Sequence, residues 1–272
     1  MADSYRIIGA EMSPYSVKVR SYFRYKAIPH QWVLRNAASQ AEYEKYAGMP
    51  IIPLLVTPEG SGIQDSTPII DAMERLYPEP SIHPDDTIAN FVSALIEEFG
   101  DEWGNKWMFH YRWARDVDQI SAAGRIARMR GPKASEQEHA AFAGQIRARM
   151  VDRVWFVGSN EVTAPQIEAG FLDMLKLLDG HLATRPYLFG GRTAFGDFGL
   201  PRFSLLLLSL GGLFLTIRAG GMEQTAQHEG KLLQRGDDDF RSVNQRRRQL
   251  LRVLINRLHH SLGVFDLVNR IL

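Results

Sequence analysis

The sequence contains no cysteine, which excludes a disulfide, a thiolate nucleophile of the protein's own and any metal site built on cysteine ligands. This absence agrees with a reducing compartment, where disulfides are rare. Residues 1–4 also lack the basic and then apolar layout that begins a secretory signal peptide. We therefore expect a cytoplasmic protein.

Membrane-length apolar runs and a strong charge imbalance are missing too. The main apolar run, residues 203–217, has about 15 residues, fewer than the roughly 20 that span a bilayer. The net charge is +1, and residues 1–200 carry 21 Lys and Arg against 25 Asp and Glu. Clustered positive charge is the usual footprint of a nucleic-acid-binding surface. The sequence thus predicts no transmembrane segment and no nucleic-acid partner.

What is present is typical of a globular protein with one large or two modest domains: 272 residues, 45% apolar and 23% charged. The first part of the chain alternates strand and helix patterns. Residues 5–10 and 30–34 are short apolar strand candidates, and they flank a helical pattern that begins at Pro14. The predicted order over residues 5–78 is β-α-β-(α)-β-β-α.

A hairpin led by proline and a helix complete this part. Pro53 opens a short apolar run, and proline is tolerated at the first residue of a strand. Residues 57–62 are dense in turn-forming residues, so the runs on either side are predicted to pair as a hairpin. Ser66 then stands where a helix N-cap is expected, with Pro68 in the first turn.

The segment Ser13-Pro14-Tyr15-Ser16 starts the first predicted helix. Ser13 can act as the N-cap, because a serine hydroxyl accepts a hydrogen bond from a free backbone amide of the first turn. The same hydroxyl can donate to an anion, which the helix dipole favours at this end. Both interpretations are open from these residues alone, and Tyr15 is a second, weaker candidate. Because Ser13 cannot form a mixed disulfide, we do not expect thiol–disulfide exchange.

Together these residues resemble the glutathione S-transferase family. The proline before a strand, the hairpin, the Asp65-Ser66 pair and the following helix are similar to the second half of its thioredoxin-like domain. Ser13 and the three residues after it stand where thioredoxin-like proteins have Cys-Pro-Tyr-Cys. The resemblance covers residues 5–200 and implies an α+β thioredoxin-like N-terminal domain followed by an all-α C-terminal domain.

The resemblance also implies roles in binding glutathione as a co-substrate. Pro53 is cis in the family, and the backbone of the residue before it, Ile52, pairs with the cysteinyl part of glutathione. Ser66 binds the γ-glutamyl carboxylate at a helix N-terminus, which suits an anion, and Asp65 takes the ammonium of the same group. Ser13 contacts the glutathione sulfur and is the predicted catalytic residue.

A proline-rich linker, residues 79–87, separates this part from an all-helical pattern. Residues 88–99 predict an amphipathic helix, and an aromatic-rich segment follows it. The family places its pocket for the electrophilic substrate here, so Trp103, Trp107 and Tyr111 are the candidate substrate-binding residues, suited to apolar or planar compounds. The alternative is that these side chains pack in the helical core.

Residues 187–198 resemble the family's C-terminal signature, in which a Ser or Thr N-cap lies three residues before a buried Asp. Asp197 is present, but Ala194 stands where the hydroxyl is expected, and Thr193 is a candidate replacement. We interpret this motif as structural. His110 stands alone, without a partner at the spacing of metal ligands.

The resemblance ends after residue 200. Pro201 falls inside what would be a long helix, where proline is strongly unfavourable. Residues 201–272 contain neither tyrosine nor tryptophan and only one lysine, whereas residues 250–258 carry Leu and Arg in the pattern of a basic amphipathic helix. A helix on an anionic membrane or partner, a helix with a solvated face, and an out-of-frame continuation of the gene are the three interpretations.

The resemblance implies a glutathione-binding domain in residues 1–78, the linker in 79–87 and a helical domain in 88–200, followed by an atypical tail in 201–272 that is either out of frame or poorly packed. The predicted function is conjugation of the glutathione thiol to an electrophilic, apolar small molecule, as in detoxification, by a homodimer. A non-enzymatic binding or scaffold protein of the same fold is the alternative. It is favoured by Asp65, where the family has Glu or Gln, and by the tail.

Overall fold

The structure is a computed structural model that describes residues 4–200, so the predictions for the tail lie outside the described residues. Its first half alternates strands and helices in the predicted order. The elements of this half are β1 (Tyr5–Gly9), α1 (Pro14–Tyr25), β2 (His30–Leu34), the 3₁₀ helix η1 (Ala37–Ser39), α2 (Gln40–Tyr46), β3 (Leu54–Val56), β4 (Gly62–Gln64) and α3 (Ser66–Leu76).

The four strands form one mixed sheet in the order β2-β1-β3-β4. Strand β1 runs parallel to β2 and antiparallel to β3. Strands β3 and β4 pair as the predicted hairpin, with Leu55 opposite Ile63. The α/β arrangement expected for this half of the chain is therefore confirmed.

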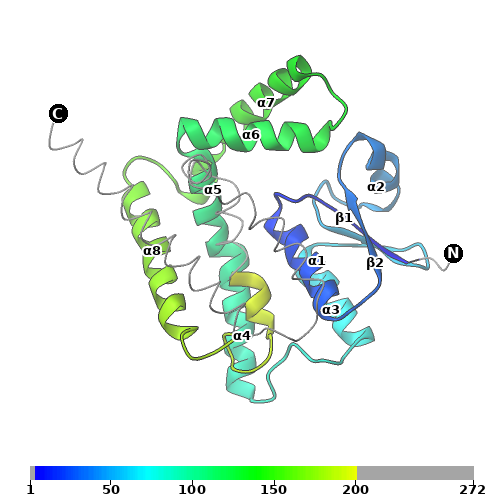
Figure 1. Cartoon of the computed structure of the whole chain (residues 1–272), viewed down its shortest axis with the longest axis vertical. Coiled ribbons are helices and arrows are strands. Elements are labelled where there is room, and N and C mark those ends of the chain that lie inside the picture. Colours follow the sequence, from blue (N-terminus) through cyan, green and yellow to red (C-terminus); the bar gives the residue numbers. More distant parts are fainter. Residues whose placement is uncertain (1–3, 201–272) are drawn as a thin grey trace, which may run out of the picture.

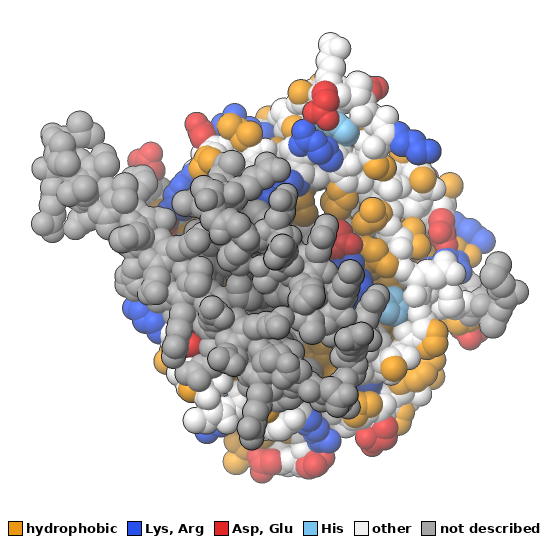
Figure 2. All heavy atoms as spheres, viewed as in Figure 1, with side chains coloured by type: hydrophobic (Ala, Val, Ile, Leu, Met, Phe, Trp, Pro, Cys, Tyr) orange, Lys and Arg blue, Asp and Glu red, His pale blue; other side chains and the backbone are white. Residues whose placement is uncertain are grey.

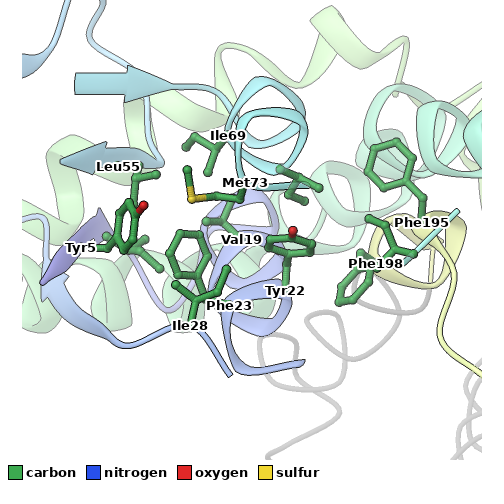
Figure 3. Close-up of a cluster of buried hydrophobic side chains, with 13 residues drawn as sticks. Tyr5, Val19, Tyr22, Phe23, Ile28, Leu55, Ile69, Met73, Phe195 and Phe198 are labelled. Atoms are coloured by element: carbon green, nitrogen blue, oxygen red, sulfur yellow. The ribbon is translucent and has the colours of Figure 1, made fainter. Parts of the chain in front are cut away.

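Helices cover both faces of the sheet, because successive side chains of a strand point to opposite sides. Ile7 and Leu55 belong to the core cluster that α1 and α3 close, and Figure 3 shows the side chains of this cluster. Ile8 and Leu54 belong to a second cluster, which Tyr43 of α2 covers. The sheet is thus a buried middle layer, and its strand ends are the places where backbone and loops remain open to a ligand.

The second half is helical. Its elements are α4 (Thr87–Glu98), the π-helical segment η2 (Phe99–Gly104), α5 (Asn105–Trp113), α6 (Asp116–Arg130), α7 (Glu136–Val151), the 3₁₀ helix η3 (Val154–Val157) and α8 (Ala164–His181). Helical backbone continues from α4 through η2 into α5 without a break. Figure 1 shows α6 and α7 across one end of α5, and α8 beside α5.

The last described residues return to the first half. Residues 195–200 are helical, and Phe195 and Phe198 belong to the same core cluster as the inner faces of α1 and α3. Their helix packs closely on the α4–η2 segment, because a Cβ atom added to Gly100 would lie 2.7 Å from the backbone of Gly199. The absence of a side chain at Gly100 thus lets the two backbones approach.

Helix α4 forms where residues 88–99 predict an amphipathic helix, but much of its apolar face lies in solvent. Ile88, Phe91 and Leu95 are 74%, 67% and 55% exposed, whereas Ser93 and Glu97 are buried. Small and polar side chains therefore occupy the packed face, since the hydroxyl oxygen of Ser93 accepts a hydrogen bond from the Gly196 amide and Glu97 contacts a buried lysine, Lys18. The apolar pattern located the helix but pointed to the wrong buried face.

Residues 118–140 are largely helical. Helices α6 and α7 form a hairpin there, with a turn at Gly131-Pro132, and Ser135 begins α7 through a capping box with Glu138. The surface in Figure 2 carries side chains of both charges with apolar patches between them. No helix in residues 4–200 is long and apolar enough to cross a membrane.

Candidate functional site at the shared end of the sheet

The predicted residues meet because of strand register. Ile8 of β1 lies opposite Leu54 of β3, and Leu54 lies opposite Gln64 of β4. Since β1 runs antiparallel to β3, and β3 antiparallel to β4, this row brings three loops to one end of the sheet. The loops are the one after β1, which leads to Ser13, the one before β3 and the one after β4.

Ser13 is the N-cap of α1. Its side-chain oxygen accepts a hydrogen bond from the Ser16 amide at 3.2 Å, and Pro14 occupies the first helical position. Gly9, at the end of β1, lets this helix start lie close to the strand, because a Cβ atom there would fall 2.8 Å from both Ser16 and Trp32. The capping role is observed. The hydroxyl proton of Ser13 is not needed for the cap, so the contact with a sulfur stays a prediction.

Tyr15, the rival hydroxyl, donates to the backbone carbonyl of Asp101 at 2.9 Å. Burial raises the pKa of Tyr15 above its ordinary value, and the charges of Asp101, Glu102 and Asp65 raise it further. The phenol therefore stays protonated at neutral pH, where it is a hydrogen-bond donor and not a base.

Gln64 holds the loop in front of β3. Its side-chain carbonyl accepts from the amides of Gly48 and Met49, and its amide group donates to the carbonyls of Met49 and Ile51. The next peptide bond, Ile52–Pro53, is cis, as the resemblance implies. No hydrogen bond within residues 4–200 engages the amide or carbonyl of Ile52. Its backbone is therefore available to pair with an extended peptide-like ligand.

The Asp65-Ser66 pair differs from its predicted arrangement. The N-cap of α3 is Asp65, whose carboxylate accepts from the Ser66 amide at 2.6 Å, and Ser66 is the first residue of the helix. Asp65 has φ 74° and ψ 146°, a strained backbone conformation for a residue with a side chain. The expectation that Ser66 caps the helix was wrong, because the left-handed turn at Asp65 places the carboxylate over the helix start.

A buried ionic cluster stands behind this turn. Lys18 of α1 is 1% exposed, and its ammonium contacts Glu97 of α4 and lies 2.6 Å from Asp101 of η2. It also lies 3.3 Å from the Ser66 hydroxyl and 3.2 Å from the Thr67 hydroxyl. The cluster therefore ties the N-terminal half of the chain to the helical half.

Asp101 is the least satisfied member of this cluster. Burial raises its pKa to about 6, although Lys18 opposes the rise, and Glu97 adds to it. One carboxylate oxygen, Oδ2, meets Lys18 and accepts from Ser66 at 3.3 Å, while Oδ1 is buried without a hydrogen-bond partner. A buried carboxylate oxygen without a partner is costly, and it is an acceptor that a ligand's ammonium could satisfy.

Comparison with known proteins finds a similarity for the N-terminal part of the chain. Residues 7–81 match the family model for the glutathione S-transferase N-terminal domain. No curated protein matches the chain.

Solved structures extend the similarity to the helical half. A glutathione transferase from Phanerochaete chrysosporium superposes with a TM-score of 0.55 at 14% identity, covering 88% of this chain and 100% of its own. A Methylobacterium radiotolerans glutathione S-transferase, solved with glutathione sulfonate, gives 0.44 at 21% identity, with coverages of 79% and 84%. Glutaredoxin 2 of Salmonella typhimurium, solved with glutathione, gives 0.47 at 19%, with 75% and 84%. The first of these shows that both halves share the transferase architecture.

The aromatic side chains on and before α5 lie in different environments. Trp107 is 8% exposed and packs against Phe171 of α8 in a buried cluster, with ring centroids 5.7 Å apart. Tyr111 is half-buried against the same cluster, and Trp103 is 60% exposed. The structure therefore does not bring these three residues together, and their role in substrate binding stays a prediction.

His110, which stands alone in the sequence, has two hydrogen-bond partners in the fold. Its Nε2 lies 3.0 Å from a carboxylate oxygen of Glu168 on α8, and its Nδ1 lies 2.8 Å from the Ser159 hydroxyl. Arg115 contacts the same carboxylate. Burial works to raise the pKa of Glu168, but the hydrogen bond with His110 and the charge of Arg115 hold it below its usual range. This cluster joins α5 and α8.

Asp197 acts as the structural residue that the signature predicts. Its carboxylate accepts from the Ala194 amide at 2.9 Å and from the Leu188 amide at 3.0 Å. The half of the capping box in which the Asp carboxylate accepts from the N-cap amide is thus present. The second hydrogen bond to this carboxylate comes from the Leu188 amide and not from a hydroxyl group. No group of three or more His, Asp or Glu side chains in the described part of the chain is arranged to hold a metal ion.

A hollow of about 380 Å³ lies between α6 and α7, lined by Ala123, Arg128, His139 and Gly144 among others. None of the predicted site residues lines it. We place the site at the shared end of the sheet instead, because the helix starts, the open backbone of Ile52 and the unsatisfied oxygen of Asp101 gather there.

Three residues of this site were missed by the sequence reasoning: Lys18, Gln64 and Asp101. Lys18 had a signal, because it lies four residues before the buried Tyr22 and so falls on the packed face of its helix. Gln64 and Asp101 had none, since their partners depend on loop conformation and on contacts between distant segments.

Proposed function

We propose that the protein is a glutathione transferase that joins the glutathione thiol to an electrophilic small molecule. One observation carries the proposal. The capped N-terminus of α1 at Ser13, the open backbone of Ile52 and the turn at Asp65 lie at one end of the sheet of a glutathione S-transferase N-terminal domain. The known structures with bound glutathione or its sulfonate support the same ligand.

The residues present fit glutathione as co-substrate. The amide and carbonyl of Ile52 are free to pair with its peptide backbone. The dipole of α1 favours an anion at Ser13, where the hydroxyl can donate to the sulfur. Glutathione supplies the thiolate, which displaces a leaving group from the electrophile as the carbon–sulfur bond forms. The chain orients the two reactants and stabilises the negative charge on sulfur.

The γ-glutamyl end has two sets of candidate contacts. Asp65 and Ser66 remain the predicted pair, but the Ser66 amide and hydroxyl already have partners in the fold. The unpaired Oδ1 of Asp101 is a further acceptor for the ammonium. We therefore expect Ser66→Ala to weaken glutathione binding partly through loss of the order that Ser66 imposes on Asp101, and not only through a lost direct contact.

The test of the proposed function is Ser13→Ala. Losing one hydrogen bond to the thiolate should lower turnover of a neutral aryl halide roughly ten- to a hundredfold, with a much smaller change in glutathione affinity measured by calorimetry. The control is Ser135→Ala, which also removes a helix N-cap, that of α7. Both variants should lose about 1 kcal/mol of stability, so only a selective fall in turnover supports catalysis by Ser13.

Unchanged turnover in Ser13→Ala would move the role to Tyr15 or to backbone amides. Glutathione binding with no turnover of any electrophile would favour the non-enzymatic binding or scaffold protein. The engaged hydrogen-bonding groups of Ser66 are the observation on that side.

We also propose a homodimer that forms through the exposed face of α4. Ile88, Phe91, Leu95 and Phe99 lie along this face at helical spacing and are all exposed, and contiguous exposed apolar side chains mark interaction sites. A twofold dimer would place the same face of both copies together. Phe91→Glu should then shift the mass measured by light scattering from dimer to monomer. A monomeric parent protein contradicts this proposal.

The cytoplasmic location stays a prediction.

A further inference from the structure

Arg112 of α5 is a buried cation without a counter-ion among the residues that the structure describes. It is 7% exposed, and its Nε and Nη2 atoms are buried with no hydrogen-bond partner in residues 4–200. The two buried lysines are satisfied, since Lys18 meets Glu97 and Asp101, and Lys26 lies 2.6 Å from Glu74. Burying an unpaired charge is strongly unfavourable, so Arg112 is exceptional.

The residues one turn before Arg112 indicate which face of α5 it occupies. Side chains three and four residues apart lie on the same face of a helix, so Arg112 shares a face with Met108 and Phe109. Met108 belongs to the cluster against which Tyr15 packs. Phe109 packs with the cluster that contains Met12. Met12 and Tyr15, which lie on either side of Ser13, thus share hydrophobic clusters with the residues beside Arg112 on α5.

The free donors of Arg112 also form a recognisable shape. Nε–H and one N–H of Nη2 point in parallel from one edge of the guanidinium, and this edge matches the two oxygens of a carboxylate. Burial lowers the pKa of Arg112 to about 9, so the group stays protonated at neutral pH. Phe109 and Trp113, one turn apart on the same helix, have ring centroids 6.5 Å apart, so aromatic side chains lie beside Arg112.

We propose that the Nε–Nη2 edge of Arg112 binds the carboxylate of the electrophilic substrate, so the transferase acts on planar organic acids in preference to neutral compounds. This deepens the proposed function and rests on it for the identity of the site. The structure thereby changes the expectation from a purely apolar substrate to an aromatic ring with one negative charge.

The first experiment measures binding without glutathione. The probes are 3,5-dinitrobenzoate and its methyl ester, titrated by calorimetry into the full chain. The parent should bind the benzoate roughly ten- to a hundredfold more tightly than the ester, because a hydrogen bond to a charged group is lost in the ester. Arg112→Met should remove the preference, and Arg112→Lys should keep part of it.

Arg128→Met is the matched control, since Arg128 is 59% exposed at its side chain and pairs with Glu136 on the far hairpin. This variant should keep the full preference. Equal affinity of the parent for the two probes, or a preference that survives in Arg112→Met, overturns the proposal. So does an Arg112→Met chain that fails to fold, because an unpaired charge should not be needed for stability.

The second experiment separates this inference from the proposed function. The thiolate of glutathione displaces chloride from 4-chloro-3,5-dinitrobenzoate and from its methyl ester, and the two rates are compared. If neither compound reacts while the binding preference depends on Arg112, the transferase function fails and the carboxylate site stands. If both react at rates that Arg112→Met leaves unchanged, the function stands and the carboxylate site is wrong.

Discussion

Lys18 and Arg112 are both buried cations at the boundary between the two halves of the chain, and their surroundings are opposite. Two carboxylates and two hydroxyls surround the ammonium of Lys18. The guanidinium of Arg112 has no acidic partner among the described residues, and two of its nitrogens are unsatisfied. The positive charge of Lys18 is therefore neutralised within the fold, whereas that of Arg112 has no acidic partner among the described residues.

The difference separates structural from binding roles. A buried charge with its own counter-ion is strongly coupled to its partners, so removing one of them destabilises the fold. A buried charge without a counter-ion costs stability in the free protein, and a ligand of opposite charge recovers that cost on binding. Removing the charge of Lys18 should consequently lower the stability of the fold, whereas removing the charge of Arg112 should leave it unchanged or raise it.

The largest effect is expected for Lys18→Met. This change leaves Glu97 and Asp101 buried without their cation, which should lower the free energy of unfolding by about 3–5 kcal/mol. Urea denaturation followed by tryptophan fluorescence measures it. A variant within 1 kcal/mol of the parent would show that the cluster does not need its cation and would remove the contrast with Arg112.

The next effect is a pH dependence that comes from Asp101. Its pKa is about 6 in the fold, against 3.8 for an ordinary aspartate, so the folded state binds more protons than the unfolded state between these values. Stability should therefore fall as the pH rises from about 4 to about 6.5, by on the order of 2–3 kcal/mol from this group. Asp101→Asn should flatten that part of the profile, and denaturation at several pH values tests it. A profile equally steep in the variant contradicts the assignment.

A smaller loss is expected for Glu168→Gln, which weakens the second ionic cluster. Arg115 is partly exposed at its side chain, 39%, so water compensates much of its lost charge partner, while the buried His110 loses a charged acceptor. We expect a loss of about 1–2 kcal/mol. Thermal melts measure it, and the His110 resonances in NMR spectra should shift at the same time. A loss as large as that of Lys18→Met would place this cluster in the same class.

The smallest effect on stability, with the opposite sign, is expected for Arg112→Met in the absence of ligand. Removing an unpaired buried charge should leave the melting temperature unchanged or raise it. Arg112→Lys keeps the charge and should not raise it. A clear drop in the melting temperature of Arg112→Met would mean that the guanidinium has a structural partner.

The sequence predicts the local features of this fold well. The strand pattern, the hairpin after Pro53 and the helix that starts at Ser13 all follow from neighbouring residues and turn chemistry, and all are present. The buried face of α4 does not follow from local pattern, because Ser93 and Glu97 are packed while Phe91 is exposed. Which face of an amphipathic helix is buried depends on what lies against it, and here that is a polar cluster.

The candidate site is predictable only in part, for the same physical reason. Ser13, Ile52 and Asp65 belong to motifs that are short in sequence. Arg112 carries no motif, and its significance lies in the absence of a partner, which no sequence pattern records. The N-cap at Asp65 was also missed, because the sequence does not show that its backbone adopts a positive φ.

The return of Phe195 and Phe198 to the first core bears on how the protein is made. The ribosome releases the N-terminal segment first. Tyr22, however, packs edge-on against Phe198, with ring centroids 5.8 Å apart. Most of the described chain must therefore be synthesised before this contact can form. Lys18 likewise gains its partners, Glu97 of α4 and Asp101 of η2, only after those later segments are synthesised. A nascent chain that ends before α4 therefore holds an incomplete core and an unpaired lysine, and chaperones and proteases should recognise it. The part that is synthesised first is among the last to be finished.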